Sequence, residues 1–208
     1  MAKSIPDLYR GYFVERQFER LDLFQLIADE FEVKRVIYPG SFVHVTPSFV
    51  FPSVVYIDSD KQANKFFRSP EIHQLIEKRK VYPQDASFMF HFADYRDGFD
   101  EKEESFDLLI SQYAGFVGQY CKSYLKKGGL LLANNSHGDA GVAAIDKDYQ
   151  LVAVFSLRNG RYKMSKSNLD DYFIPKSSVQ FTKEYLMQLQ KGIGYTKSSN
   201  TYLFRRIQ

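Results

Sequence analysis

Tryptophan is absent from this chain of 208 residues, and cysteine occurs only once, at Cys121. A lone cysteine cannot form an internal disulfide, which suits a reducing compartment, so we expect a cytoplasmic protein. No run of about 18 apolar residues is present, so we expect no membrane span. The first residues, Met-Ala-Lys-Ser-Ile-Pro-Asp, have no apolar core of the kind found in a secretory signal.

Several chemical signatures are also missing. The sequence has no His/Cys cluster at the spacing of a zinc site. It has neither the glycine-rich phosphate loop of nucleotide triphosphatases nor a G-x-G-x-x-G dinucleotide motif. These absences argue against a protein that binds zinc, a nucleoside triphosphate or a dinucleotide.

Charge is distributed unevenly along the chain. The net charge is +3, yet residues 151–208 carry 10 basic and only 3 acidic side chains. A basic surface can attract phosphates, so a nucleic-acid partner is a weak hypothesis. A solvated surface with an uneven charge distribution, and no nucleic-acid partner, explains the same charge counts.

Short apolar runs alternate with helical patterns over residues 33–134. We expect strands at Lys34–Tyr38, Ser53–Ile57, Ser87–Phe92, Phe106–Ser111 and Leu130–Ala133. This alternation predicts an α/β fold with a doubly wound, mostly parallel sheet and helices on both faces. Two helices are expected in residues 1–32, and a further helix at Gly115–Lys127, ended by Gly128-Gly129.

The pattern changes after residue 134. Asn159-Gly160 between two apolar runs predicts a β-hairpin, because both turn positions require a positive φ. Near the end, Tyr195–Lys197 and Thr201–Ile207 are expected to form an antiparallel closing pair. At this length the chain is expected to form a single domain.

Three residues stand at or after the carboxyl ends of the first three expected strands, where ligands of open α/β sheets bind. Gly40 would let a ligand approach the backbone. Asp58, 18 positions later, could accept hydrogen bonds from two ribose hydroxyls. Asp94 could accept one from an adenine amino group, with Tyr95 beside the ring. Each also has a structural interpretation, as a turn glycine, a helix cap and a polar loop residue.

Two segments give the chain its family resemblance, Ser105-Phe-Asp-Leu-Leu-Ile and Tyr124-Leu-Lys-Lys-Gly-Gly-Leu-Leu-Leu. In this order they resemble the class I S-adenosylmethionine-dependent methyltransferases. The resemblance implies a seven-stranded sheet with an antiparallel closing strand, an inserted hairpin region at residues 136–178, and S-adenosylmethionine as cofactor. The cofactor-binding residues it implies are Tyr38, Gly40, Ser41, Asp58, Ser59, Asp94, Tyr95, Ser111 and Gln112.

Catalytic candidates follow the fourth and fifth expected strands. Tyr113 and His137 could contact the methyl acceptor or remove its proton, and His137 lies in a polar cluster at residues 134–139. His44 is a further candidate base after the first strand. The expected acceptor is a small molecule. The Asp/Asn-Pro-Pro-aromatic motif of exocyclic-amine methylation and a Pro-Cys nucleophile are both absent.

The glycine loop departs from the family pattern. Tyr38, Phe42 and His44 occupy positions where the family has an acid and further glycines, so only Gly40 remains. Two alternatives therefore stay open. One is a methyltransferase-like protein that binds or regulates without catalysis, and the other is a methyltransferase directed at nucleic acid.

Overall fold

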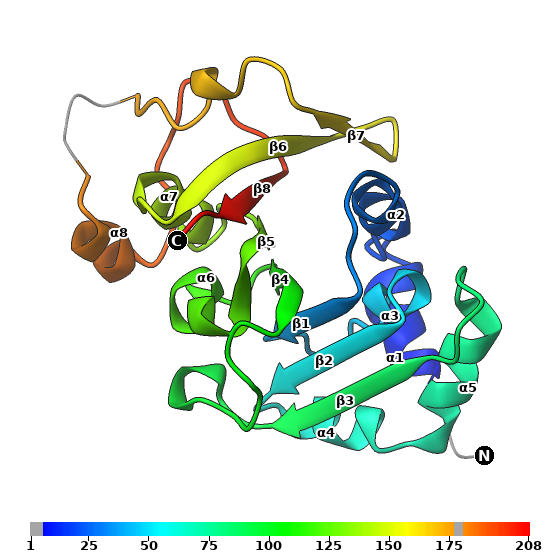
Figure 1. The fold of residues 1–208 in the computed structure, drawn as a ribbon. Coiled ribbons are helices and arrows are strands. Elements are labelled where there is room, and N and C mark those ends of the chain that lie inside the picture. The colour runs from blue at the N-terminus through cyan, green and yellow to red at the C-terminus, as the bar shows by residue number, and fades with distance from the viewer. Residues whose placement is uncertain (1–5, 177–180) are drawn as a thin grey trace. The chain divides into compact units, whose positions relative to one another are not determined.

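The computed structural model describes residues 6–176 and 181–208. The chain divides into two compact units, Met1–Phe99 and Asp100–Gln208, and each is described by itself (Figure 1). None of the helices in the described ranges is long and apolar enough to cross a membrane.

Three parallel strands form the sheet of the first unit. They are β1 (Arg35–Pro39), β2 (Ser53–Asp58) and β3 (Ser87–Phe92), in the order β3-β2-β1. Figure 1 shows them side by side, and the register pairs Pro39 with Ile57 and Asp58 with Phe92. Because the strands are parallel and in register, their carboxyl ends lie at one edge of this sheet. The interiors of β1 and β2 are buried, as their continuous apolar runs predict.

Helices surround these strands. They are α1 (Pro6–Tyr9), the π-helical turn η1 (Arg10–Val14), α2 (Leu21–Glu30), α3 (Pro47–Val50), α4 (Lys61–Phe67), α5 (Pro70–Arg79) and the 3-10 turn η2 (Tyr95–Asp97). Residues 1–5 of the expected amino-terminal helical region lie outside the described residues. α2 begins after Arg20, whose φ is 58° and whose side chain makes no cap hydrogen bond.

The second unit combines parallel and antiparallel pairing. β4 (Phe106–Ser111) and β5 (Leu125–Ala133) are parallel, and β8 (Thr201–Arg206) runs antiparallel to β5. β6 (Tyr149–Arg158) pairs antiparallel with both β8 and β7 (Arg161–Ser165). The described helices of this unit are α6 (Val117–Tyr120), η3 (Lys122–Tyr124), α7 (Asp139–Ile145), η4 (Leu169–Asp171) and α8 (Lys183–Leu189).

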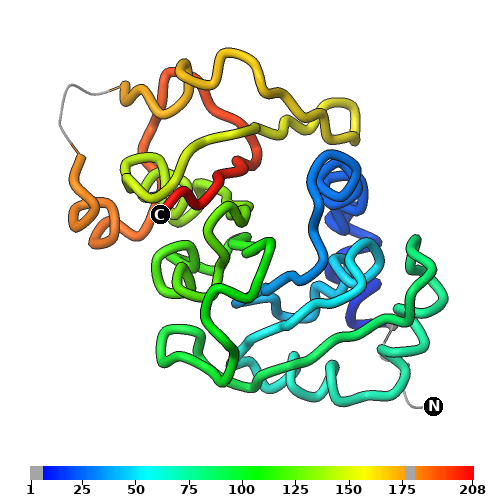
Figure 2. Tube along the Cα trace, viewed as in Figure 1, coloured from blue at the N-terminus to red at the C-terminus, as the bar shows by residue number. Residues whose placement is uncertain are grey.

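The predicted hairpin is confirmed. Asn159 and Gly160 have φ values of 52° and 73°, and the chain reverses between β6 and β7 at this point (Figure 2). β6 is more than one arm of a hairpin, because it pairs with β8 along its length. It thus belongs to the main sheet of the second unit.

Two expectations for this unit are wrong. The helix expected at Gly115–Lys127 ends at Tyr120, and Lys126 and Lys127 already belong to β5. Pairing of Phe106 with Leu125 and the ion pair between Lys126 and Asp107, at 2.6 Å, favour the strand over the last helical turn.

The expected closing pair is not formed either. Tyr195 makes only an isolated bridge to Pro175, and the antiparallel partners of β8 are β5 and β6. The interior of β8 is buried between these two strands, which satisfies its backbone on both edges.

The predicted fold class is confirmed. Parallel pairs join β1 to β2, β2 to β3 and β4 to β5, antiparallel strands close the sheet around β8, and helices accompany the strands. The described residues contain eight strands rather than the seven expected, because β7 adds the second arm of the hairpin.

Replacement of Asp60 by alanine is expected to destabilise the first unit. The Asp60 side chain caps α4 by accepting hydrogen bonds from the N–H groups of Gln62 and Ala63. Loss of such a cap costs about 1 kcal/mol, to be measured by urea unfolding. Asp85→Ala removes an exposed acid of the same unit and serves as control. Equal unfolding midpoints for the two variants would contradict the assignment.

Candidate functional site

The turn after β1 is fixed to the end of β2. Gly40 has a φ of 65°, and its N–H donates to the carbonyl oxygen of Ile57 at 2.8 Å. Phe42 has a φ of 47°, and its N–H donates to Oδ2 of Asp58 at 2.7 Å. The left-handed conformations at Gly40 and Phe42 fold the loop back onto the end of the neighbouring strand.

Asp58 holds two backbone segments together. Oδ2 accepts from Phe42, and Oδ1 accepts from the N–H of Asp60 at 2.8 Å. Asp60, not Asp58, caps α4 with its side chain. A carboxylate offers about four lone pairs, so two remain for further donors. Asp58 is half-buried and the following Ser59 is exposed, so these acceptors are within reach of a ligand.

Asp94 follows β3 and is engaged by Arg96. Its carboxylate accepts from the Arg96 N–H at 2.9 Å and from the guanidinium Nε at 2.9 Å and Nη2 at 2.5 Å. These hydrogen bonds lower the pKa of Asp94 to about 2. Tyr95 is half-buried at the start of the 3-10 turn. An adenine amino group at Asp94 would have to share the carboxylate with Arg96.

Tyr38 and His44 are part of the core. His44 Nε2 lies 3.0 Å from the carbonyl oxygen of Glu19, so this nitrogen carries the proton, and Nδ1 accepts from the Tyr38 hydroxyl at 3.1 Å. The Phe13 ring stacks on the imidazole at 4.3 Å. Burial, with the nearby Arg20 charge, lowers the pKa of His44 to about 3. His44 is therefore a neutral core residue in this conformation, with both nitrogens occupied.

Ser41 is also buried, and its hydroxyl donates to the carbonyl oxygen of Phe42 at 3.3 Å. Tyr38 and Ser41 can therefore contribute to a ligand site through their backbone rather than through their hydroxyls.

In the second unit, Ser111 at the end of β4 faces a buried acid. Its hydroxyl donates to Oδ2 of Asp139 at 2.5 Å, and the N–H of Gly118 donates to the same oxygen at 2.9 Å. Oδ1 of Asp139 is buried and has no hydrogen-bond partner among the described residues. Burial raises the pKa of Asp139 to about 6. The sequence interpretation noted the polar cluster at 134–139 but missed the Asp139 contact.

Gln112 is buried beside the same cluster. Its Oε1 accepts from Asn134 Nδ2 at 3.3 Å, while Asn134 Oδ1 accepts from the N–H and hydroxyl of Ser136 at 3.1 and 2.7 Å. Ser111 and Gln112 thus brace the ends of β4 and β5, and neither side chain faces solvent.

Tyr113 and His137 lie on the outside of this braced region. Tyr113 is 52% exposed with a φ of 62°, an uncommon conformation for an aromatic residue that is often retained at functional sites. His137 is exposed between Ser136 and Gly138. Of the predicted site residues in the second unit, these two are the ones accessible to an acceptor.

The first unit places its three predicted residues at one edge of its sheet. Neighbouring strands lie about 4.8 Å apart, so the ends of β1, β2 and β3 span a width of about 10 Å. Gly40 directly follows β1, Asp58 is the last residue of β2, and Asp94 lies two residues after β3. This edge therefore presents two carboxylate acceptors, Asp58 and Asp94, over a width of about 10 Å.

Comparison with known proteins shows similarity at the level of the fold. No protein-family model matches the chain, and no curated protein matches it. Among solved structures, a protein from Corynebacterium glutamicum is 9% identical, with a TM-score of 0.50, over 74% of this chain and 85% of that one. A methyltransferase from Geobacter sulfurreducens is 16% identical, with a TM-score of 0.49, over 74% and 83% respectively.

A SAM-dependent methyltransferase from Thermotoga maritima is 11% identical, with a TM-score of 0.48, over 98% of this chain and 96% of that one. At these identities the likeness concerns the fold alone.

The stability of the protein is expected to fall in acid because of His44. Its pKa of about 3 in the folded state lies below the unfolded value of about 6.5. The unfolded chain therefore binds the proton first, and stability present above pH 6.5 is lost as the pH falls. The expected loss between pH 7 and pH 5 is about 2 kcal/mol. Urea unfolding of the parent and of His44→Gln measures it. A variant with the parent's pH dependence would contradict the prediction.

Asp139 is expected to make the protein less stable as the pH rises, which is opposite to the effect of His44. Its folded pKa of about 6 exceeds the unfolded value of about 3.9, so its stabilising contribution is lost as the pH rises through 6. Between pH 5 and pH 7 the parent should lose about 1 kcal/mol of its free energy of unfolding through this group. Asp139→Asn has no carboxyl to titrate and should not show this loss. Unfolding at the two pH values checks the sign. A relative change of zero, or of opposite sign, would show that Asp139 is not held as a buried acid.

Proposed function

We propose that the protein is an S-adenosylmethionine-dependent methyltransferase that acts on a small molecule. The observation that carries the proposal is the hydrogen-bonded contact between the turn after β1 and the end of β2. There the Asp58 carboxylate accepts from the Phe42 and Asp60 N–H groups, and about two of its four lone pairs remain for a ligand. Ribose hydroxyls are donors that match these positions, as at other nucleotide sites of doubly wound sheets.

The remaining cofactor contacts follow from neighbouring residues. The left-handed turn at Gly40 lets the amino-acid end of the cofactor approach the backbone of residues 38–41. Asp94 and Tyr95 receive the adenine, with Arg96 yielding one of its hydrogen bonds to Asp94. Ser59 lies beside the ribose-binding carboxylate. The cofactor, when bound, supplies an electrophilic methyl group.

Tyr113 and His137 are the residues that contact the methyl acceptor in this proposal. Methyl transfer from a sulfonium is an in-line displacement, so the protein mainly aligns the acceptor and, where required, removes a proton. The exposed imidazole of His137 is the candidate base, and the exposed phenol of Tyr113 is the candidate positioning group. Ser111 and Gln112 support them by bracing the strand ends.

A second function is favoured by two observations. Arg96 occupies Asp94 with a bidentate ion pair, and bulky Phe42 stands where the family has glycine. A protein that binds a ligand at this edge without turning it over is the alternative that fits these contacts. Transfer of a labelled methyl group to any member of a panel of small acceptors would exclude it.

Binding of S-adenosylhomocysteine, measured by calorimetry, tests the proposal. The parent should bind, and Asp58→Ala should weaken binding by about 1–3 kcal/mol, because ribose hydroxyls lose charge-assisted hydrogen bonds. Asp85→Ala, an exposed acid of the same unit, should bind as the parent does. Since Asp58 also holds Phe42, the folded state of each variant is checked by circular dichroism. Absence of heat with the parent at millimolar ligand would remove the cofactor assignment.

A further inference from the structure

β3 is the terminal strand of the sheet, and β2 is its only partner among the described strands. The N–H groups of Ser87 and Ala93 point to β2, where they donate to Pro52 and Asp58. Backbone direction alternates along a strand, and the β2–β3 register is unbroken. The N–H and C=O groups of Phe88, Phe90 and Phe92 therefore point to the open edge.

The composition of this edge is unusual. Natural edge strands carry lysine, proline or a bulge that blocks pairing with another chain. The sequence of β3 is Ser-Phe-Met-Phe-His-Phe and contains none of these. Met89 is 53% exposed and Phe92 is 49% exposed. An uncharged, apolar strand with a free edge is suited to pairing with a second strand.

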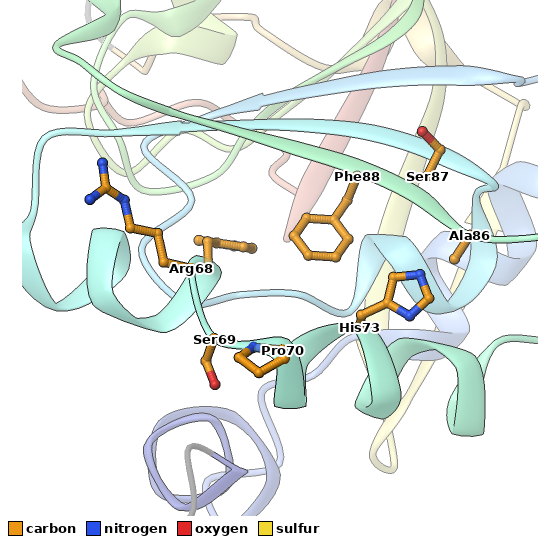
Figure 3. Close-up of a pocket in the computed structure, with 8 residues that line it drawn as sticks. Arg68, Ser69, Pro70, His73, Ala86, Ser87 and Phe88 are labelled. Atoms are coloured by element: carbon orange, nitrogen blue, oxygen red, sulfur yellow. The ribbon is translucent and has the colours of Figure 1, made fainter.

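A hollow lies beside the first half of this strand. Its volume is about 460 Å³, and it is lined by Phe67, Arg68, Ser69, Pro70, His73, Ala86, Ser87 and Phe88. Figure 3 shows the Phe88 ring and the His73 imidazole beside the hollow between β3 and α5. Phe67 packs against Phe88 at 6.2 Å and against Phe90 at 4.7 Å, so the hollow is on the face to which these phenylalanines point.

Phe92 shares this face, because side chains at i, i+2 and i+4 of a strand point the same way. It lies at the opposite end of β3 from the hollow, and half of its side chain is exposed. One end of the strand thus offers an aromatic side chain and the other end offers a partly apolar hollow.

We infer that two copies of the protein associate through β3, with Phe92 of each copy entering the hollow of the other. An antiparallel pair centred on a two-fold axis at Phe90 sets Phe88 opposite the partner's Phe92, and Met89 opposite the partner's His91. In this register all three outward-facing residues exchange backbone hydrogen bonds. Their rings form one row on the face of the hollow, and no two like charges meet.

A second copy is the occupant that the strand itself favours. The pairing is isologous, so each copy places its Phe92 in the hollow of the other, and the same contact forms twice. The partner's own β3 brings a phenylalanine to the hollow in register with all three outward pairs, so the strand is complementary to itself. Sheet extension gives the backbone contacts and the hollow gives side-chain selectivity.

Sedimentation of the full chain from micromolar to millimolar concentration tests the inference. The parent should form a dimer. Phe92→Ala, which empties the hollow, should raise the dissociation constant at least tenfold. Phe92→Pro, which also removes an outward N–H without touching the bonds to β2, should abolish the dimer. Val81→Ala, also exposed in the first unit, is the control and should dimerise as the parent does.

Disulfide trapping fixes the register. A mixture of Met89→Cys and His91→Cys proteins should form a mixed covalent dimer on oxidation, because these two positions face each other in a non-hydrogen-bonded pair. Each variant alone should yield little. The native Cys121 is buried and should contribute little background. A monomeric parent, a dimer unaffected by the Phe92 changes, or equal trapping by the single variants would overturn the inference.

Discussion

The carboxylate of Asp58 is the contact on which the candidate site depends. It joins the N–H of Phe42, in the loop after β1, to the N–H of Asp60, which begins the cap of α4. A charged acceptor with two backbone donors is worth more than a neutral hydrogen bond. This contact holds the Gly40 turn against the end of β2 and leaves acceptor positions on the carboxylate for a ligand.

The loop around it is held in place by contacts on several sides, although Gly40 is its only glycine over residues 40–46. Phe42 adopts the left-handed φ that a glycine would adopt readily, at a cost that its surroundings must offset. Its N–H is bonded to Asp58, and its ring packs edge-on against Tyr12 at 5.0 Å. His44, which the sequence offered as a base, instead anchors the loop through Tyr38 and Glu19. The bulky side chains of Phe42 and His44 are thus accommodated in the loop by these contacts.

Sequence patterns predicted most of the fold, because burial dominates there. The apolar runs of β1, β2 and β4 and the Asn159-Gly160 turn carry local signals strong enough to place them. The pattern failed where tertiary pairing overrides a local preference. Leu125, Lys126 and Lys127 look helical but belong to β5, where Leu125 pairs with Phe106 of β4. β8 takes its partners from far along the chain. The occupation of Asp94 by Arg96, and of Ser111 by Asp139, was not predicted, because such contacts depend on side-chain directions.

The most direct measurement is a crystal structure of the protein with S-adenosylhomocysteine. Ribose hydroxyls are expected on the Asp58 carboxylate, with the Phe42 N–H still bound to Oδ2 and the adenine near Asp94. A ligand bound elsewhere, or a loop in which the Phe42 ring fills the space beside Asp58, would contradict the central claim.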